Sequence, residues 1–215
     1  MLLFDFQSNG ESIGSHQTFG ALESLDARAA CEFVKSRIPH EPVAVIGSSL
    51  GGAAAILGET PLDVQAIVIE AAYPTIEEAA ANRIAYHVGA WVPSHLLAQL
   101  LLVQLRPRIG VSAMELRPID RIGSVKAPIL MMAGSKDIDT TAEESRRLFQ
   151  AAPDPKEYWE IPGAVHQDFH AFVRDEYEHR VIEFFNRYLT SAQKRSMLSS
   201  GFEDSVPGES SDGKS

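Results

Sequence analysis

The sequence predicts an α/β fold, a mostly parallel sheet flanked by helices. Short runs that are apolar on both faces alternate with longer stretches of helical periodicity, as parallel strands covered by helices do. The chain has 215 residues, of which 45% are hydrophobic and 22% are charged. A globular domain of this size can bury a full core without disulfides or metals.

Five short apolar runs are the expected strands. They lie at residues 2–6, 43–46, 66–69, 129–133 and 157–161. Helices are expected at residues 21–38, 141–151 and 168–189. The first of these helices carries an apolar stripe and is followed by Pro39, which cannot continue it. The stripe consists of Leu22, Leu25, Ala29 and Phe33.

An insertion at residues 73–120 stands outside this alternation. It is rich in Ala and Leu, is predicted to be largely helical, and contains Trp91. Its plain interpretation is an ordinary pair of core helices. Its functional interpretation is a cap or lid over a pocket for an apolar substrate. The main domain is expected to span residues 1–190 around this insertion.

The composition changes near the end of the sequence. From residue 191 onward it is dominated by Ser, Gly, Lys, Glu and Asp, with almost no large apolar side chains. Such a segment cannot bury enough apolar surface to fold. Residues 191–215 are therefore predicted to be a disordered tail.

Charge and cysteine content argue against several classes of protein. The 19 Lys and Arg residues against 29 Asp and Glu give a formal net charge of −10, and the basic residues form no run, which argues against a nucleic-acid partner. The single Cys31 excludes an internal disulfide framework and a Cys-rich zinc module, and a buried thiol is expected.

Membrane insertion and secretion are not expected either. The most apolar stretch, residues 88–105, is interrupted by Pro93, Ser94 and other polar residues, and falls short of the roughly 20 apolar residues that a span needs. The first residues lack the positive charge of a signal peptide. The sequence therefore predicts a cytoplasmic protein without a membrane span.

A candidate nucleophile lies directly after the second expected strand. That strand runs into Gly47-Ser48-Ser49-Leu50-Gly51, and an Ala-rich, helix-forming run follows. A strand, a tight turn and a helix around a central serine form a nucleophile elbow, in which Ser49 would be exposed. The Leu50 N–H at the helix start could help to hold an oxyanion.

This pattern has competing interpretations. Glycine and serine are common, so the pentapeptide also arises by chance, although here it follows a strand and precedes a helix. Ser48 could be the nucleophile instead, but Ser49 holds the central position. A phosphate-binding loop is disfavoured because no lysine follows Gly51-Gly52.

Candidate partners for the serine follow two later strands. A serine nucleophile needs a base, and the base needs an acid to orient it. Asp137 comes just after the strand at 129–133, and His166 comes just after the strand at 157–161. The active sites of open α/β sheets form at the carboxyl ends of strands. Ser49, Asp137 and His166 are therefore the predicted catalytic residues.

Each partner also has a simpler interpretation. Asp137 or Asp139 could cap the helix that follows, and His166 could be structural. His166 and His170 have the spacing of a helical zinc pair, but Gln167 stands where that pattern requires Glu. No metal and no cofactor are therefore expected.

Taken together, these segments resemble the α/β-hydrolase superfamily. The similarity lies in Gly47 to Gly51, in the acid segment from Pro128 to Asp137 and in the histidine segment from Pro162 to His166. Residues 3–6 with Asn9-Gly10-Glu11-Ser12, and residues 20–26, are similar to the region ahead of the elbow in many bacterial members. The resemblance covers nearly all of the chain up to about Leu189.

The resemblance implies a chemistry and a substrate class. Ser49 would attack an acyl carbon, His166 would carry the proton, and Asp137 would orient His166. The expected reaction is cleavage of a carboxylic ester or related acyl bond through an acyl-enzyme, on a small substrate with an apolar part. A peptidase or a thioesterase of the same superfamily is the alternative enzyme, and a noncatalytic hydrolase-like protein is the alternative from another class.

The sequence departs from the superfamily ahead of the elbow. The superfamily has further strands there, and a loop after its third strand supplies the second oxyanion N–H; the first 48 residues contain no counterpart. We therefore expect an amino-terminally shortened sheet, in which the strand at 2–6 either pairs with the strand at 43–46 or detaches. Loss of one oxyanion donor typically lowers turnover by about 100- to 1000-fold.

Overall fold

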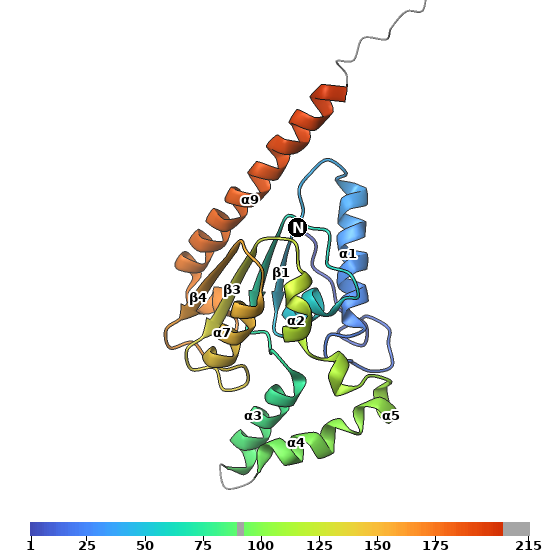
Figure 1. The fold of residues 1–215 in the computed structure, drawn as a ribbon, viewed down its shortest axis with the longest axis vertical. Helices are drawn as coiled ribbons and strands as arrows, with labels where there is room; N and C mark the ends of the chain where they lie inside the picture. The colour runs from blue at the N-terminus through green and yellow to red at the C-terminus, as the bar shows by residue number, and fades with distance from the viewer. Residues whose placement is uncertain (90–92, 204–215) are drawn as a thin grey trace, which may run out of the picture.

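A four-stranded parallel sheet forms the centre of the molecule (Figure 1). The computed structural model describes residues 1–89 and 93–203, with side chains described to residue 190. The strands, in spatial order, are β1 (Ala44–Ser48), β2 (Ala66–Glu70), β3 (Ile129–Gly134) and β4 (Lys156–Ile161). Every neighbouring pair is parallel. The predicted fold class, a parallel sheet flanked by helices, is confirmed.

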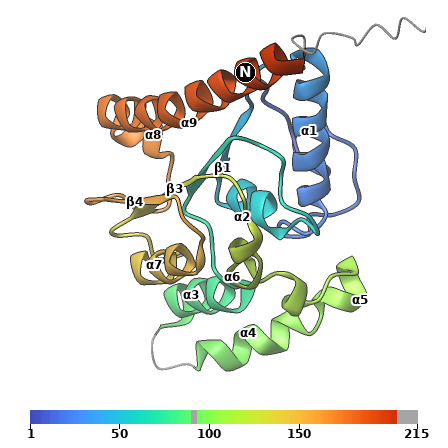
Figure 2. The ribbon, with the colours of Figure 1, turned by 45° about the horizontal axis from the view of Figure 1, so that its top comes forward.

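Helices cover both faces of this sheet (Figure 2). One apolar cluster joins Ile67, Ile69 and Ile129 of the sheet to α1, α2 and α7, and a second joins Val68 and Leu130 to α8 and α9. Side chains of a strand alternate between its faces, so neighbouring residues of β2 serve the two clusters. The helices are α1 (Glu23–Arg37), α2 (Leu50–Leu57), α3 (Ile76–Val88), α4 (Ser94–Leu102), α5 (Leu105–Ile109), α6 (Pro118–Arg121), α7 (Ala142–Ala151), α8 (Phe169–Phe172) and α9 (Arg174–Glu203), with short 3₁₀ turns η1 (Ala113–Glu115) and η2 (Ile122–Ser124).

The strand predicted at residues 2–6 does not form, so that prediction is wrong. These residues have no regular secondary structure, and β1 pairs only with β2. The segment bonds instead to its own turn and to α1: Ser12 Oγ donates to the Asp5 carbonyl at 2.8 Å, and the Gln7 N–H donates to Asp26 Oδ2 at 2.9 Å. The sheet of the described residues therefore ends at β1, where Ile46 is 50% exposed.

Helix α1 presents a different face to the core from the one its apolar stripe predicts. Its buried residues are Glu23, Ser24, Ala27 and Cys31, whereas the stripe from Leu22 to Phe33 is exposed. The cause is the Glu23 carboxylate, which accepts hydrogen bonds from the Thr18 N–H, the Thr18 hydroxyl and the Gly20 N–H. These bonds satisfy a buried charge and fix the helix start. Cys31 is a buried free thiol, as predicted.

The inserted residues between β2 and β3 are largely helical. Helices α3, α4 and α5 lie together at one end of the molecule (Figures 1 and 2). They pack on α2 through a third apolar cluster that includes Ile76, Ala98 and Leu102. Trp91 lies outside the described residues.

The last helix is longer than the sequence predicts. Helix α9 continues to Glu203, although the apolar periodicity ends near Leu189. The added residues contain good helix formers and no proline before Pro207, so nothing in the sequence stops the helix there. The predicted tail at 191–215 therefore begins inside a helix, and residues 204–215 lie outside the description. Among the described residues, no helix is both long and apolar enough to span a bilayer.

Candidate active site

Ser49 occupies a strained turn between a strand and a helix. Strand β1 ends at Ser48 and helix α2 begins at Leu50. Ser49 has φ of 50° and ψ of −109°, a conformation that residues with a side chain rarely adopt. Its N–H donates to the Glu70 carbonyl at 2.7 Å, and its carbonyl accepts from the Ala53 N–H at 3.1 Å. Bonds to the neighbouring strand and to α2 thus hold the serine in place.

The two glycines of the pentapeptide have unequal roles in this turn. A Cβ on Gly47 would lie 2.5 Å from the Gly51 carbonyl oxygen and 2.8 Å from the Gly52 nitrogen. Both are backbone atoms, so only glycine fits at position 47. A Cβ on Gly51 would meet only Phe6, at 4.0 Å. The first glycine is therefore required sterically, and the second is not.

The structure brings the three predicted catalytic side chains together. His166 Nε2 lies 3.0 Å from Ser49 Oγ, and His166 Nδ1 lies 2.8 Å from Asp137 Oδ2. Each residue follows the carboxyl end of a different strand: β1, β3 or β4. The Asp137 side chain is fully buried, and that of His166 is 26% exposed. The result is a continuous hydrogen-bonded relay from a buried acid to an accessible serine.

The electrostatics keep the acid charged and the imidazole basic. Burial raises the pKa of Asp137, but hydrogen bonds from His166 and Thr140 outweigh burial and lower the pKa below its ordinary value. The hydrogen bond to Asp137 raises the pKa of His166 above its ordinary value, against the opposing effect of burial. A carboxylate at Nδ1 favours the tautomer with the proton on Nδ1, which leaves Nε2 free to accept a proton from Ser49.

Thr140 belongs to this site, although the sequence did not draw attention to it. Its N–H donates to Asp137 Oδ1 and its hydroxyl to Asp137 Oδ2, each at 2.9 Å. The Asp139 N–H also donates to Asp137 Oδ1, at 2.9 Å. An aspartate followed by a threonine three residues later, after a strand end, is the local signal of such a turn. These donors hold the Asp137 carboxylate toward His166.

The helix-cap interpretation of the two aspartates does not hold. The N-cap of α7 is Thr141, whose hydroxyl accepts from the Glu144 N–H at 3.3 Å, while the Glu144 carboxylate accepts from the Thr141 N–H at 2.8 Å. Asp139 is instead paired with Arg83, at 2.8 Å between Oδ1 and Nε. Asp137 faces the histidine, and Asp139 faces the arginine.

One group of described side chains could offer ligands to a metal ion. Ligand atoms of Asp137, Asp139 and His166 lie within 4.8 Å of one another. Both ring nitrogens of His166 already have partners, however, and so does the Asp139 carboxylate. His170, weighed above as a second zinc ligand, bonds to Glu178 through Nε2 at 2.8 Å. A metal would have to displace the relay to bind there.

A largely apolar cavity opens beside the serine. Its volume is about 410 Å³, and it includes Ser49, Leu50 and His166. Arg83, Asp139 and Thr140 supply the rest of its polar wall. The remaining lining residues are Phe19, Tyr73, Ile76, Ala79, Ala80, Leu101, Leu102 and Leu105, drawn mainly from α3, α4 and α5. The inserted helices thus form one wall of the cavity that holds the relay.

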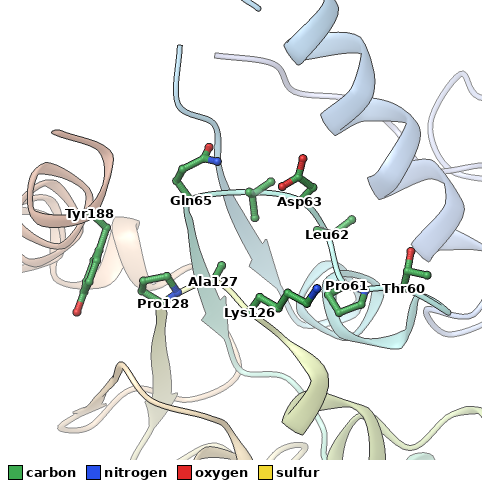
Figure 3. Close-up of a pocket in the computed structure, with 10 residues that line it drawn as sticks. Thr60, Pro61, Leu62, Asp63, Gln65, Lys126, Ala127, Pro128 and Tyr188 are labelled. Carbon is green, nitrogen blue, oxygen red and sulfur yellow. The ribbon is translucent and has the colours of Figure 1, made fainter. Parts of the chain in front are cut away.

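A second cavity, of about 440 Å³, lies near the segments that precede β2 and β3 (Figure 3). It contains none of the predicted catalytic residues. Its polar side chains include Asp63, which pairs with Lys35, and Gln65, whose Oε1 accepts from the Val43 N–H at 2.7 Å. Since these groups serve the fold, we place no chemistry in this cavity.

Comparisons with known proteins place this geometry in context. No family model matches the chain. It is 33% identical over 174 residues to the uncharacterized protein Rv2307c of Mycobacterium tuberculosis, covering 78% of this chain and 53% of that protein. It is 23% identical over 199 residues to the uncharacterized protein YqkD of Bacillus subtilis, covering 90% of this chain and 64% of that protein. The chain thus spans between about half and two thirds of the length of these curated relatives.

Solved structures share the arrangement of strands and helices. The esterase Pf2001 of Pyrococcus furiosus superposes with a TM-score of 0.66 at 24% identity, covering 86% of this chain and 69% of that one. The α/β hydrolase GrgF of a Penicillium species gives 0.65 at 16% identity, covering 87% and 79%. The esterase domain of a Rhodothermus marinus protein gives 0.53 at 25% identity, covering 77% and 69%. This chain is a protein of the α/β-hydrolase fold.

Proposed function

We propose that this chain is a serine hydrolase that cleaves a carboxylic ester or related acyl bond through an acyl-enzyme. The observation that carries the proposal is the relay of Ser49, His166 and Asp137, with its contacts of 3.0 and 2.8 Å, at the wall of an apolar cavity. A serine with an oriented base beside a substrate-sized cavity is the arrangement that acyl transfer requires.

Each residue of the relay has a defined role in this mechanism. His166 Nε2 takes the proton of Ser49 as Oγ attacks the acyl carbon, and then returns it to the leaving alcohol. A water molecule, activated by the same nitrogen, cleaves the acyl-enzyme. Asp137 holds the Nδ1–H tautomer and stabilises the imidazolium that forms, because it is buried, charged and held by Thr140.

The oxyanion of the tetrahedral intermediate would lie at the start of α2. The Leu50 N–H is at the first position of that helix, where an N–H has no acceptor within the helix and the helix dipole is positive. Removing one oxyanion donor typically lowers turnover by about 100- to 1000-fold, so in this proposal the Leu50 N–H contributes a large part of the rate.

The substrate would carry a small apolar group. In this proposal α3, α4 and α5 act as a cap, and the leucines of the cavity wall exclude water from the acyl or alcohol part. Arg83 is paired with Asp139, so this pair adds no net charge to the cavity wall. Short and medium-chain esters fit these features.

Hydrolysis of p-nitrophenyl esters tests the proposal. Ser49→Ala should lower kcat/KM by about 10⁴-fold or more, because it removes the nucleophile. The matched control is Ser48→Ala, at the neighbouring exposed position, which should stay within about threefold of the wild type. Equal activity of Ser49→Ala and wild type, or no hydrolysis by folded wild type, would contradict the proposal.

A further inference from the structure

Helix α4 is apolar on the side that faces away from the core. Ala98 and Leu102 are buried in the third apolar cluster. Leu96, Leu100 and Val103 are 55%, 58% and 68% exposed, and their spacing places them together on the opposite side of the helix. A surface helix ordinarily presents polar side chains there. Three neighbouring exposed aliphatic side chains therefore indicate a contact surface.

This surface lies at the outside of the molecule and extends toward the candidate active site. Figures 1 and 2 show α4 beyond α3, on the side away from the sheet. The neighbouring Leu101, which is 54% exposed, also lines the cavity that contains Ser49. A ligand held at the outer side of α4 would thus be close to the apolar cavity that contains Ser49.

The charge around α4 is opposite in sign to that of the whole protein. Residues 79–114 include three arginines and no Asp or Glu, in a chain with a formal net charge of −10. Arg106 and Arg108, on α5 just after α4, are exposed and make no ion pair with any residue that the structure describes. The next acidic residue, Glu115, is bound by the Ser112 N–H and hydroxyl, and it attracts Arg106 from beyond ion-pair distance.

We propose that the aliphatic face of Leu96, Leu100 and Val103 on α4, together with Arg106 and Arg108 on the following helix α5, docks on an anionic lipid surface. An aliphatic helix face beside unpaired basic side chains binds the boundary between headgroups and acyl chains. A symmetric pair of copies fits less well, because it would bring Arg106 and Arg108 of both copies into one interface. Docking itself does not depend on the proposed hydrolysis.

Vesicle flotation of the full chain tests this docking. The Ser49→Ala variant is mixed with vesicles of phosphatidylcholine alone, or with about one third phosphatidylglycerol, so that the charge of the surface is the variable. We expect binding to the anionic vesicles that weakens at high salt. Leu96→Glu with Leu100→Glu should reduce it at least about tenfold, and Arg106→Gln with Arg108→Gln by about tenfold to thirtyfold. Ile182→Glu, at a position 56% exposed on α9, is the matched control and should not change it.

The outcomes separate docking from the alternatives. Absence of binding to anionic vesicles, or binding that survives Leu96→Glu with Leu100→Glu, overturns the proposal. A dimer in light scattering that the same pair of substitutions dissociates, without vesicle binding, assigns the surface to a second copy instead. Leu96 and Leu100 do not line the cavity, so their variants should hydrolyse p-nitrophenyl acetate like wild type. Failure of that hydrolysis in wild type contradicts the proposed function and leaves the vesicle result intact.

Discussion

The central strands β2 and β3 are better covered than β1, the strand at one end of the described sheet. Every residue of β2 and β3 is buried, whereas β1 exposes Ile46 and Ser48, and the nearby α1 exposes its apolar stripe. The candidate site takes Asp137 from the loop after the buried strand β3 and Ser49 from the turn after the more exposed strand β1. Ser49 is nevertheless fixed, because its N–H bonds to the Glu70 carbonyl of β2 and because Gly47 permits the tight turn. Local backbone geometry, namely the close contact at Gly47 and the bond to β2, therefore positions Ser49.

The largest expected effect on activity is at Asp137, after the buried strand β3. Asp137→Asn should lower kcat for ester hydrolysis by about 10⁴-fold, because an amide favours the wrong histidine tautomer. Asp139→Asn should keep most of the activity, since Asp139 pairs with Arg83 and not with His166. Steady-state kinetics of both variants make the comparison. A larger loss in Asp139→Asn would move the acid to that residue.

The second effect tests whether local geometry alone positions the serine. Gly47→Ala should lower kcat/KM by about 100-fold or more and destabilise the fold by about 1–3 kcal/mol, because its Cβ would overlap the backbone of Gly51 and Gly52. Gly51→Ala is the matched control, with free space at its Cβ, and should keep activity and stability. Kinetics and urea unfolding measure both variants. Equal tolerance of the two substitutions would show that the elbow does not depend on close backbone contact.

The third effect compares how much a side chain of β3 and a side chain of β1 contribute to the free energy of unfolding. Ile129→Ala, at a fully buried position of β3, should lower the free energy of unfolding by about 2–5 kcal/mol. Ile46→Ala, at the half-exposed position of β1, should cost less than about 1.5 kcal/mol, because water already reaches that side chain. Urea titrations give both values. A cost at Ile46 equal to that at Ile129 would indicate that β1 is covered in solution.

The smallest effect is a pH dependence of stability at the end of β2. Burial raises the pKa of Glu70 above its ordinary value, against the hydrogen bonds from Tyr177 and Ser48. A raised pKa in the folded state gives stability that is complete below the ordinary pKa of about 4.3 and is lost as pH rises through the raised value. Glu70→Gln keeps an acceptor for Tyr177 and has no such proton to lose. The free energy of unfolding of Glu70→Gln should therefore rise relative to that of wild type as the pH increases above the ordinary pKa of the carboxyl group, and a constant difference would contradict the shift.

Local signals in the sequence predicted much of this molecule. Four strands, the turn at Ser49 and the strand-end placement of Asp137 and His166 each depend on residues close together in the chain. The alternation of apolar strands and helices then implies a parallel sheet, which brings the carboxyl ends of the strands to one edge. The structure accordingly places the three side chains within hydrogen-bonding distance.

The features that the sequence did not predict depend on partners distant in the chain. The apolar run at residues 2–6 has strand character, but a strand needs a neighbour; here Asp5 bonds to its own turn, and Gln7, just after the run, bonds to α1 instead. The buried side of α1 is set by Glu23 and the loop at Thr18 rather than by the apolar stripe. Thr140 contacts the Ala71 carbonyl at 3.2 Å as well as Asp137, a long-range contact that no pattern of spacing reveals.

Labelling with a fluorophosphonate, followed by peptide mass spectrometry, tests the central claim most directly. This reagent reacts covalently with a serine only where a base activates it. The account predicts one modified residue, Ser49, with labelling abolished in Ser49→Ala, strongly reduced in His166→Ala and retained in Ser48→Ala. Modification of another residue, or no modification of the folded protein, would contradict it.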